Sequence, residues 1–140
     1  MAVSGVYRSM FDMDGLPSVG DTDNLLGVRP HRDITADANG DVHPGKEGMS
    51  VTPDWTRLPP MLIPERLRPL VPAARGKDAL NIWRLKGVVF EDGRVGQSLM
   101  LTVTRPKHGV VGPALRMPLA ALQESLANTR QDWELDEGSP

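Results

Sequence analysis

The stretch Gly48-Met49-Ser50-Val51 is short, β-prone and carries one hydroxyl side chain. Two other segments share this character: Tyr7-Arg8 near the start, and His108-Gly109-Val110-Val111-Gly112-Pro113-Ala114 near the end. Each segment places one polar group, an Arg, a Ser or a His, beside or inside a β-prone run. Because the three are far apart in sequence, they converge only if their strands assemble into one β-structure. A cleft lined by these groups suits an anionic nucleotide better than a hydrophobic partner.

Length and composition predict one domain over residues 1–140, since domains commonly hold about 100–150 residues. The hydrophobic share is 39% and the aromatic share only 4%, so the core is expected to be aliphatic. Trp55, Trp83 and Trp133 are expected to anchor the core or an interface. The chain has no cysteine, which excludes a disulfide scaffold, a thiolate zinc site and a cysteine nucleophile.

The charge balance carries no strong nucleic-acid signature. Sixteen basic and eighteen acidic residues leave a net charge of −2, whereas dedicated nucleic-acid modules show a basic face. No apolar run approaches the roughly 18–20 residues of a membrane span. The first residues lack the charged and apolar regions of a cleavable signal, so export would require another route.

Thirteen prolines and fourteen glycines break the chain into short elements and argue against a helical bundle. Alternation and β-propensity predict strands at residues 3–10, 49–52, 79–85, 99–104 and 109–111. Residues 11–46 are rich in turn signals and are predicted to form a long N-terminal loop, part of which covers the cleft. The predicted fold class is therefore α+β.

Helical elements are expected to be few. The best candidate is 117–130, with Pro118 in its first turn and a leucine stripe at Leu119, Leu122 and Leu126. It should end near Asn128 or Thr129. A single helical turn is expected at residues 65–67.

The three segments, followed by Met117, the leucine-rich helix and Trp133, recur in this order in a known group. The chain resembles, from about residue 6 to 133, the small type VI secretion effector toxins with an ADP-ribosyltransferase-like fold, and their relatives among polymorphic toxins. The resemblance implies a split antiparallel β-core that holds NAD between two small sheets. It also implies toxicity in the cytoplasm of a target cell and neutralisation by a cognate immunity protein.

The resemblance carries over to individual residues. Arg8 matches the position whose basic side chain meets the NAD phosphate or ribose, and Ser50 matches the hydroxyl residue beside the nicotinamide ribose. His108 falls at the third family segment. The expected catalytic residues are thus Arg8, Ser50 and His108, and the expected NAD-binding residues are Tyr7, Arg8, His31, Arg32, Gly48, Met49 and Ser50.

The chemistry of these residue types is compatible with that assignment. A guanidinium forms two parallel hydrogen bonds to phosphate oxygens, and a glycine beside Ser50 allows a backbone to approach a ligand closely. The basic cluster around His31 and Arg32, on the long loop, could cover phosphates. On residue types alone, other interpretations stay open. Arg8 can be a solvated strand residue with a surface ion pair, Ser50 is more often an ordinary turn or strand residue, and His108 can be a strand-entry histidine with one backbone hydrogen bond.

One departure from the family pattern concerns a glutamate. Arginine-targeting transferases place a Glu on a late strand, and residues 92–123 contain none. Either the chemistry runs without it, or Glu91 or Glu124 reaches the cleft, or the protein is no transferase. A non-catalytic protein-binding module on the same fold therefore remains an alternative. An enzyme acting on RNA phosphates is a third, because some transferase relatives handle 2′-phosphates and Arg29, His31 and Arg32 form a basic cluster. The sequence leaves the ADP-ribose acceptor open among a protein, a nucleic acid, a small molecule and water.

No metal site is expected. The three histidines lack the spacing of a zinc pair on one helix, and the Asp-rich stretches at 12–15 and 21–24 lack the full calcium-loop pattern.

Overall fold

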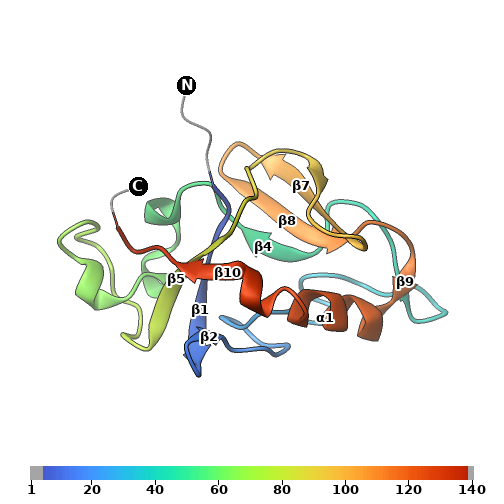
Figure 1. Cartoon of the computed structure of the whole chain (residues 1–140), viewed down its shortest axis with the longest axis horizontal. Coiled ribbons are helices and arrows are strands. Elements are labelled where there is room, and N and C mark those ends of the chain that lie inside the picture. The colour runs from blue at the N-terminus through green and yellow to red at the C-terminus, as the bar shows by residue number, and fades with distance from the viewer. Residues whose placement is uncertain (1–4, 139–140) are drawn as a thin grey trace.

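The computed structural model describes residues 5–138 and consists of two antiparallel sheets, a short two-stranded ladder and one α-helix (Figure 1). The first sheet has the order β10-β5-β1-β2 and contains β1 (Tyr7–Met13), β2 (Leu16–Pro17), β5 (Leu80–Leu85) and β10 (Trp133–Leu135). The second has the order β4-β8-β7-β6 and contains β4 (Met49–Val51), β6 (Gly93–Arg94), β7 (Leu99–Arg105) and β8 (His108–Pro113). The fold is mixed α+β, as the sequence predicts.

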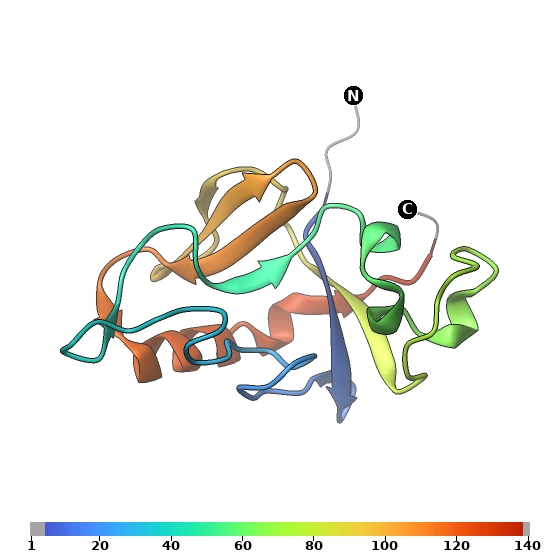
Figure 2. The same ribbon diagram turned by 180° about the vertical axis from the view of Figure 1, so that it is seen from behind.

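The two sheets are joined at one point, between β1 and the end of β4. The Tyr7 N–H donates to the Thr52 carbonyl at 2.9 Å, and the Thr52 N–H donates back to Tyr7 at 3.0 Å. Beyond this bridge β1 pairs with β5 while β4 pairs with β8, so the two strands part, as Figure 2 shows. Arg8 and Ser9 on β1, and Ser50 and Val51 on β4, line the opening between the sheets.

The main core fills the space between the second sheet and the helix α1 (Leu119–Ala127). Leu122 and Leu126 are fully buried and belong to one apolar cluster with Met49, Leu101 and Val111. The three tryptophans are buried, which confirms their predicted role as core anchors. Burial of apolar side chains from α1 and the strands is the main term that holds the helix to the sheet.

A second, smaller apolar cluster covers the other face of the first sheet. Ile82 and Trp83 are neighbours on β5 and point to opposite faces, so Trp83 joins the main core while Ile82 packs with Trp55, Ile63 and Ala74. The covering segment contains three 3₁₀ helices: η1 (Trp55–Arg57), η2 (Pro60–Leu62) and η3 (Glu65–Leu67). The last of these is the single turn predicted from the sequence.

The structure differs from the sequence prediction in the long N-terminal loop. Strand β1 continues to Met13 and turns back into β2 at Asp14-Gly15, where both residues have positive φ, 58° and 86°. Aspartate followed by glycine tolerates this left-handed geometry, so the segment forms a hairpin. The predicted start of the first strand at residues 3–4 lies outside the described residues.

The helix also begins later than predicted. Met117 and Pro118 form β9 (Met117–Pro118), which pairs with β3 (Asp41–Val42), and Pro118 becomes the residue before α1. The helix ends at Ala127 and is followed by the 3₁₀ helix η4 (Arg130–Asp132). No helix in residues 5–138 is long and apolar enough to cross a membrane.

Gly48 is held in place by the neighbouring strand. A Cβ atom added to it would lie 2.5 Å from the carbonyl oxygen of Val111 and 2.9 Å from its carbonyl carbon. Backbone atoms in a paired strand cannot move away as a flexible side chain can. The glycine therefore allows β8 to pass directly beside the start of β4.

We predict that Gly48→Ala lowers the free energy of unfolding by about 1–3 kcal/mol, the usual range for overpacking. Gly45→Ala is the matched control, because nothing lies within 4 Å of a Cβ built there. Urea denaturation of both variants measures the difference, and equal stability would contradict the steric account.

Candidate functional site

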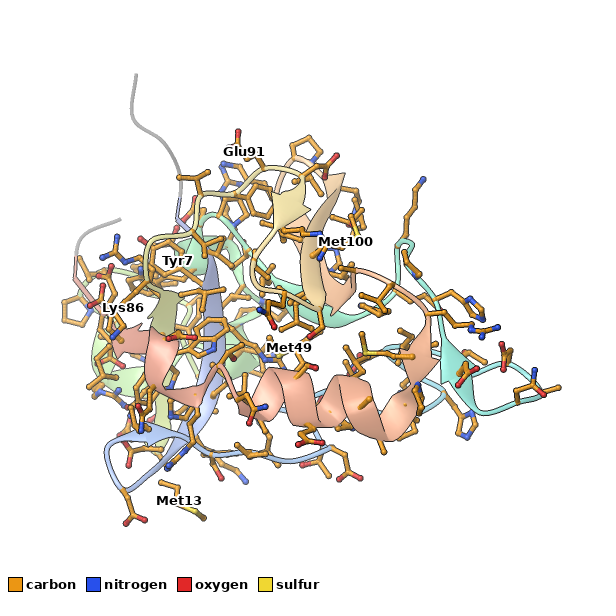
Figure 3. The ribbon with its side chains drawn as sticks, turned by 45° about the vertical axis from the view of Figure 1, so that its right-hand side comes forward. Tyr7, Met13, Met49, Lys86, Glu91 and Met100 are labelled. Carbon is orange, nitrogen blue, oxygen red and sulfur yellow. The ribbon has the colours of Figure 1, made fainter. Side chains whose placement is uncertain are left out.

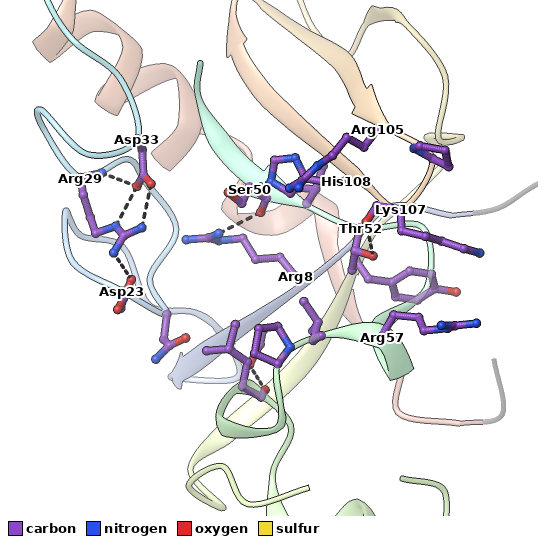
Figure 4. Close-up of a pocket in the computed structure, with 18 residues that line it drawn as sticks. Arg8, Asp23, Arg29, Asp33, Ser50, Thr52, Arg57, Arg105, Lys107 and His108 are labelled. Carbon is purple, nitrogen blue, oxygen red and sulfur yellow. Dashed lines mark hydrogen bonds and ion pairs between the residues drawn. The ribbon is translucent and has the colours of Figure 1, made fainter. Parts of the chain in front are cut away.

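A pocket of about 780 Å³ lies at the opening between the two sheets (Figure 4). Its size is in the range of small-molecule sites, roughly 300–1,000 Å³. Strands β1 and β4, the turn from β7 to β8, the loop before residue 34 and the segment after η1 all contribute to it. Its apolar lining residues are Val51, Leu58, Pro59, Leu62 and Pro106, and its cationic ones are Arg8, Arg29, Arg57, Arg105 and Lys107.

Arg8 crosses the pocket and links three parts of the chain. Its Nη1 donates to the Ser50 carbonyl oxygen at 2.9 Å, while Nε and Nη2 donate to the Leu25 carbonyl oxygen at 3.3 and 2.9 Å. Burial lowers the pKa of this guanidinium to about 10, so it stays charged at neutral pH. Three of its five N–H groups are engaged, and one on each terminal nitrogen remains for another acceptor.

Ser50 and His108 face each other across the β4–β8 pair. The Ser50 Oγ lies 3.3 Å from His108 Nε2, and His108 Nδ1 lies 2.6 Å from the hydroxyl of Thr104. Burial, and secondarily the nearby Arg105, lower the pKa of His108 below its ordinary value. The ring is therefore neutral at pH 7, the state in which one nitrogen can accept a proton.

The loop wall of the pocket is built on a charged cluster. Arg29 contacts Asp33 at 3.0 Å and Asp23 at 2.7 Å, and the Asp33 carboxylate also accepts the Arg29 backbone N–H at 2.7 Å. The hydrogen bond from Arg29 to Asp33 raises the pKa of Arg29. Because Arg29 occupies both carboxylates, the other cations of the pocket keep their positive potential.

Those remaining cations give the pocket a positive character within an acidic chain. Arg105 and Lys107 have no carboxylate within 4.0 Å among the described residues, and Arg57 has only a long contact of 3.9 Å with Asp54. A cationic rim around an apolar lining suits an organic anion. Tyr7 adds an aromatic ring.

Four of the residues predicted from the sequence come together here: Tyr7, Arg8, Ser50 and His108 all line the pocket. The other four predicted NAD-binding residues do not. The Met49 side chain is fully buried in the core, and Gly48 lies against Val111.

His31 and Arg32 lie in an exposed turn outside the pocket. The His31 N–H donates to the Ile34 carbonyl, and the Arg32 N–H donates to Arg29. This basic cluster therefore contributes Arg29, and not its two neighbours, to the pocket.

The sequence analysis missed several lining residues. Arg29 and Asp33 have the i, i+4 spacing of an ion pair, a signal that would have separated them from the solvated part of their cluster. Arg105 pairs with His108 across the two-residue turn Pro106-Lys107, so the closeness of Arg105 and Lys107 to His108 in the sequence was the available signal.

Neither candidate glutamate reaches the pocket. Glu91 and Glu124 are exposed, and Glu91 points away from the molecule in Figure 3. The carboxylates that line the pocket are Asp23 and Asp33. Within residues 5–138 no three His, Asp or Glu side chains are grouped to hold a metal ion.

No family model, curated protein or solved structure matches this chain.

We predict that Arg105→Gln raises the pKa of His108. Removing a nearby cation favours the protonated ring, although burial, the larger cause, keeps the pKa below the ordinary value. Side-chain NMR titration measures the shift, with Arg94→Gln on the exposed β6 as the control. A pKa that is unchanged or lower in Arg105→Gln would contradict the assignment.

Proposed function

We propose that this chain is an NAD-binding bacterial toxin domain of ADP-ribosyltransferase-like type, either a transferase or an NAD-consuming effector. One observation carries the proposal: Arg8, Ser50 and His108, from three distant segments, line one cationic pocket at the opening between two antiparallel sheets. This is the arrangement that the resemblance implies for an NAD cleft.

The composition of the pocket supports a dinucleotide. NAD combines a pyrophosphate with two flat rings, and the pocket combines guanidinium and ammonium groups with Tyr7 and an apolar lining. Arg8 offers its two remaining N–H groups in the fork geometry that phosphate oxygens accept. Its attachment to two backbone carbonyls fixes the guanidinium before a ligand arrives, which reduces the entropy lost on binding.

The proposed reaction breaks the bond between C1′ of the ribose and the nicotinamide nitrogen. Nicotinamide leaves with the bonding electrons, and an acceptor nucleophile attacks the oxocarbenium-like centre. Ser50 would hold the ribose hydroxyls, and neutral His108 would accept the proton that the acceptor loses. With water as acceptor the products are ADP-ribose and nicotinamide.

A positive charge that develops at C1′ needs a counter-charge, and no glutamate lines the pocket. Asp23 is the more available of the two lining carboxylates, since its side chain is 68% exposed whereas Asp33 is 10% exposed and bound twice by Arg29. The missing glutamate is also what favours the alternative, a non-catalytic protein-binding module on the same fold.

The biological setting follows from the resemblance. The domain would reach the cytoplasm of a target cell without a cleavable signal peptide, and a cognate immunity protein would protect the producer. Covering the pocket, or locking the loop that carries Asp23 and Arg29, would be sufficient for neutralisation.

We predict that induced cytoplasmic expression arrests growth and lowers cellular NAD, and that Ser50→Ala and His108→Gln relieve both effects. Purified His108→Gln should consume NAD at least about 100-fold more slowly than the wild type, because 100-fold is the lower end of general acid–base contributions. His43→Gln is the matched control, since His43 lies outside the pocket and pairs with Asp37 at 2.6 Å.

Arg8→Ala is a poor probe by itself, because it also removes the attachment of two backbone carbonyls. Each variant is therefore compared at matched thermal stability. If the wild type arrests growth and the folded Ser50→Ala and His108→Gln variants arrest it equally, the binding module is favoured. Normal growth with unchanged NAD would remove the toxin assignment.

A further inference from the structure

Thr104 occupies an irregular position on β7. The strand pairs Val103 with Gly109 and Arg105 with His108, which leaves Thr104 without a partner in the ladder. Irregularities of this kind re-aim a side chain and are frequent beside active sites. Here the Thr104 hydroxyl lies 2.6 Å from His108 Nδ1 and 3.1 Å from the His108 carbonyl oxygen.

The direction of these hydrogen bonds follows from counting protons. A carbonyl oxygen only accepts, so the contact of 3.1 Å is favourable only when the hydroxyl proton of Thr104 points to it. The lone pairs of the same oxygen then face His108 Nδ1, which must carry the ring proton. Because the ring is neutral at pH 7, Nε2 is left unprotonated toward the Ser50 hydroxyl.

The opposite arrangement satisfies fewer groups. If Thr104 donated to Nδ1, its oxygen would lie 3.1 Å from the carbonyl oxygen with no proton between them. His108 Nε2–H would then donate to Ser50 Oγ and could not accept a proton. Only the first arrangement makes all three contacts hydrogen bonds.

We propose that Thr104 is a positioning residue that holds His108 as the Nδ1–H tautomer and aims its basic Nε2 at Ser50 and the pocket. The catalytic consequence rests on the proposed function, whereas the tautomer does not. A hydroxyl suits this task because it is uncharged. A carboxylate in its place would raise the pKa of the ring and favour imidazolium, which accepts no proton.

The test is nitrogen-15 NMR of the histidine side chains at pH 7.5, with His108 assigned by comparison with His108→Gln. The wild type should show a protonated Nδ1 and an unprotonated Nε2. Thr104→Val keeps the shape but removes the hydroxyl, so both tautomers should become populated, and Thr104→Ser should restore the single one. Thr102→Val, at another half-buried threonine of β7, should change nothing.

A wild-type ring protonated at Nε2 would overturn the proposal, and so would a tautomer unchanged in Thr104→Val. If Thr104→Val does not fold, the His108 tautomer in the wild type and in Thr104→Ser still tests the proposal. Thr104→Val should lower the rate of NAD consumption at least about tenfold, the loss typical when the hydrogen-bond partner of a metal-bound histidine is removed. If the wild type shows the predicted tautomer but does not consume NAD, the positioning role of Thr104 is supported and the proposed function is contradicted.

Discussion

The attachment of the Arg8 guanidinium to the carbonyl oxygens of Ser50 and Leu25 is the interaction on which the pocket depends. In the part of the chain that the structure describes, the two sheets are joined by a single backbone bridge, between Tyr7 and Thr52, and they part beyond it. Arg8 spans the opening next to that bridge and fixes both β4 and the loop that forms the far wall. Charge-assisted hydrogen bonds offset part of the cost of withdrawing a cation from water. Because its partners are neutral carbonyls, Arg8 leaves its positive charge available to a ligand.

This arrangement explains how a slightly acidic chain carries a positive site. Arg29 pairs with both oxygens of Asp33 and with one oxygen of Asp23. The local potential is therefore set mainly by Arg8, Arg105 and Lys107. Burial, and secondarily Arg105, lower the pKa of His108, which favours the neutral ring that can accept a proton. The positive potential of the pocket is a local property, which the net charge of −2 does not reveal.

Local pattern was sufficient to predict the α+β class, the positions of most strands, and the meeting of Arg8, Ser50 and His108, because each follows from β-prone runs that must pair. It was insufficient where a segment distant in the sequence determines the local structure. Met117 and Pro118 read as the start of a helix but pair with β3, and Gly48 admits the backbone of β8 where a ligand was expected. The irregularity that turns Thr104 toward His108 depends on the register between two strands, which no spacing within one strand encodes.

The central claim, that the opening between the sheets binds NAD, is tested most directly by titrating NAD into the isotope-labelled protein and following backbone amide resonances. The account predicts saturable shifts concentrated at residues 7–9, 50–52 and 105–108, which line the pocket from β1, from the end of β4 and from the turn between β7 and β8. It also predicts that added salt weakens them, because the site is cationic. Absence of shifts at millimolar NAD, or shifts confined to the exposed turn around His31, would contradict it.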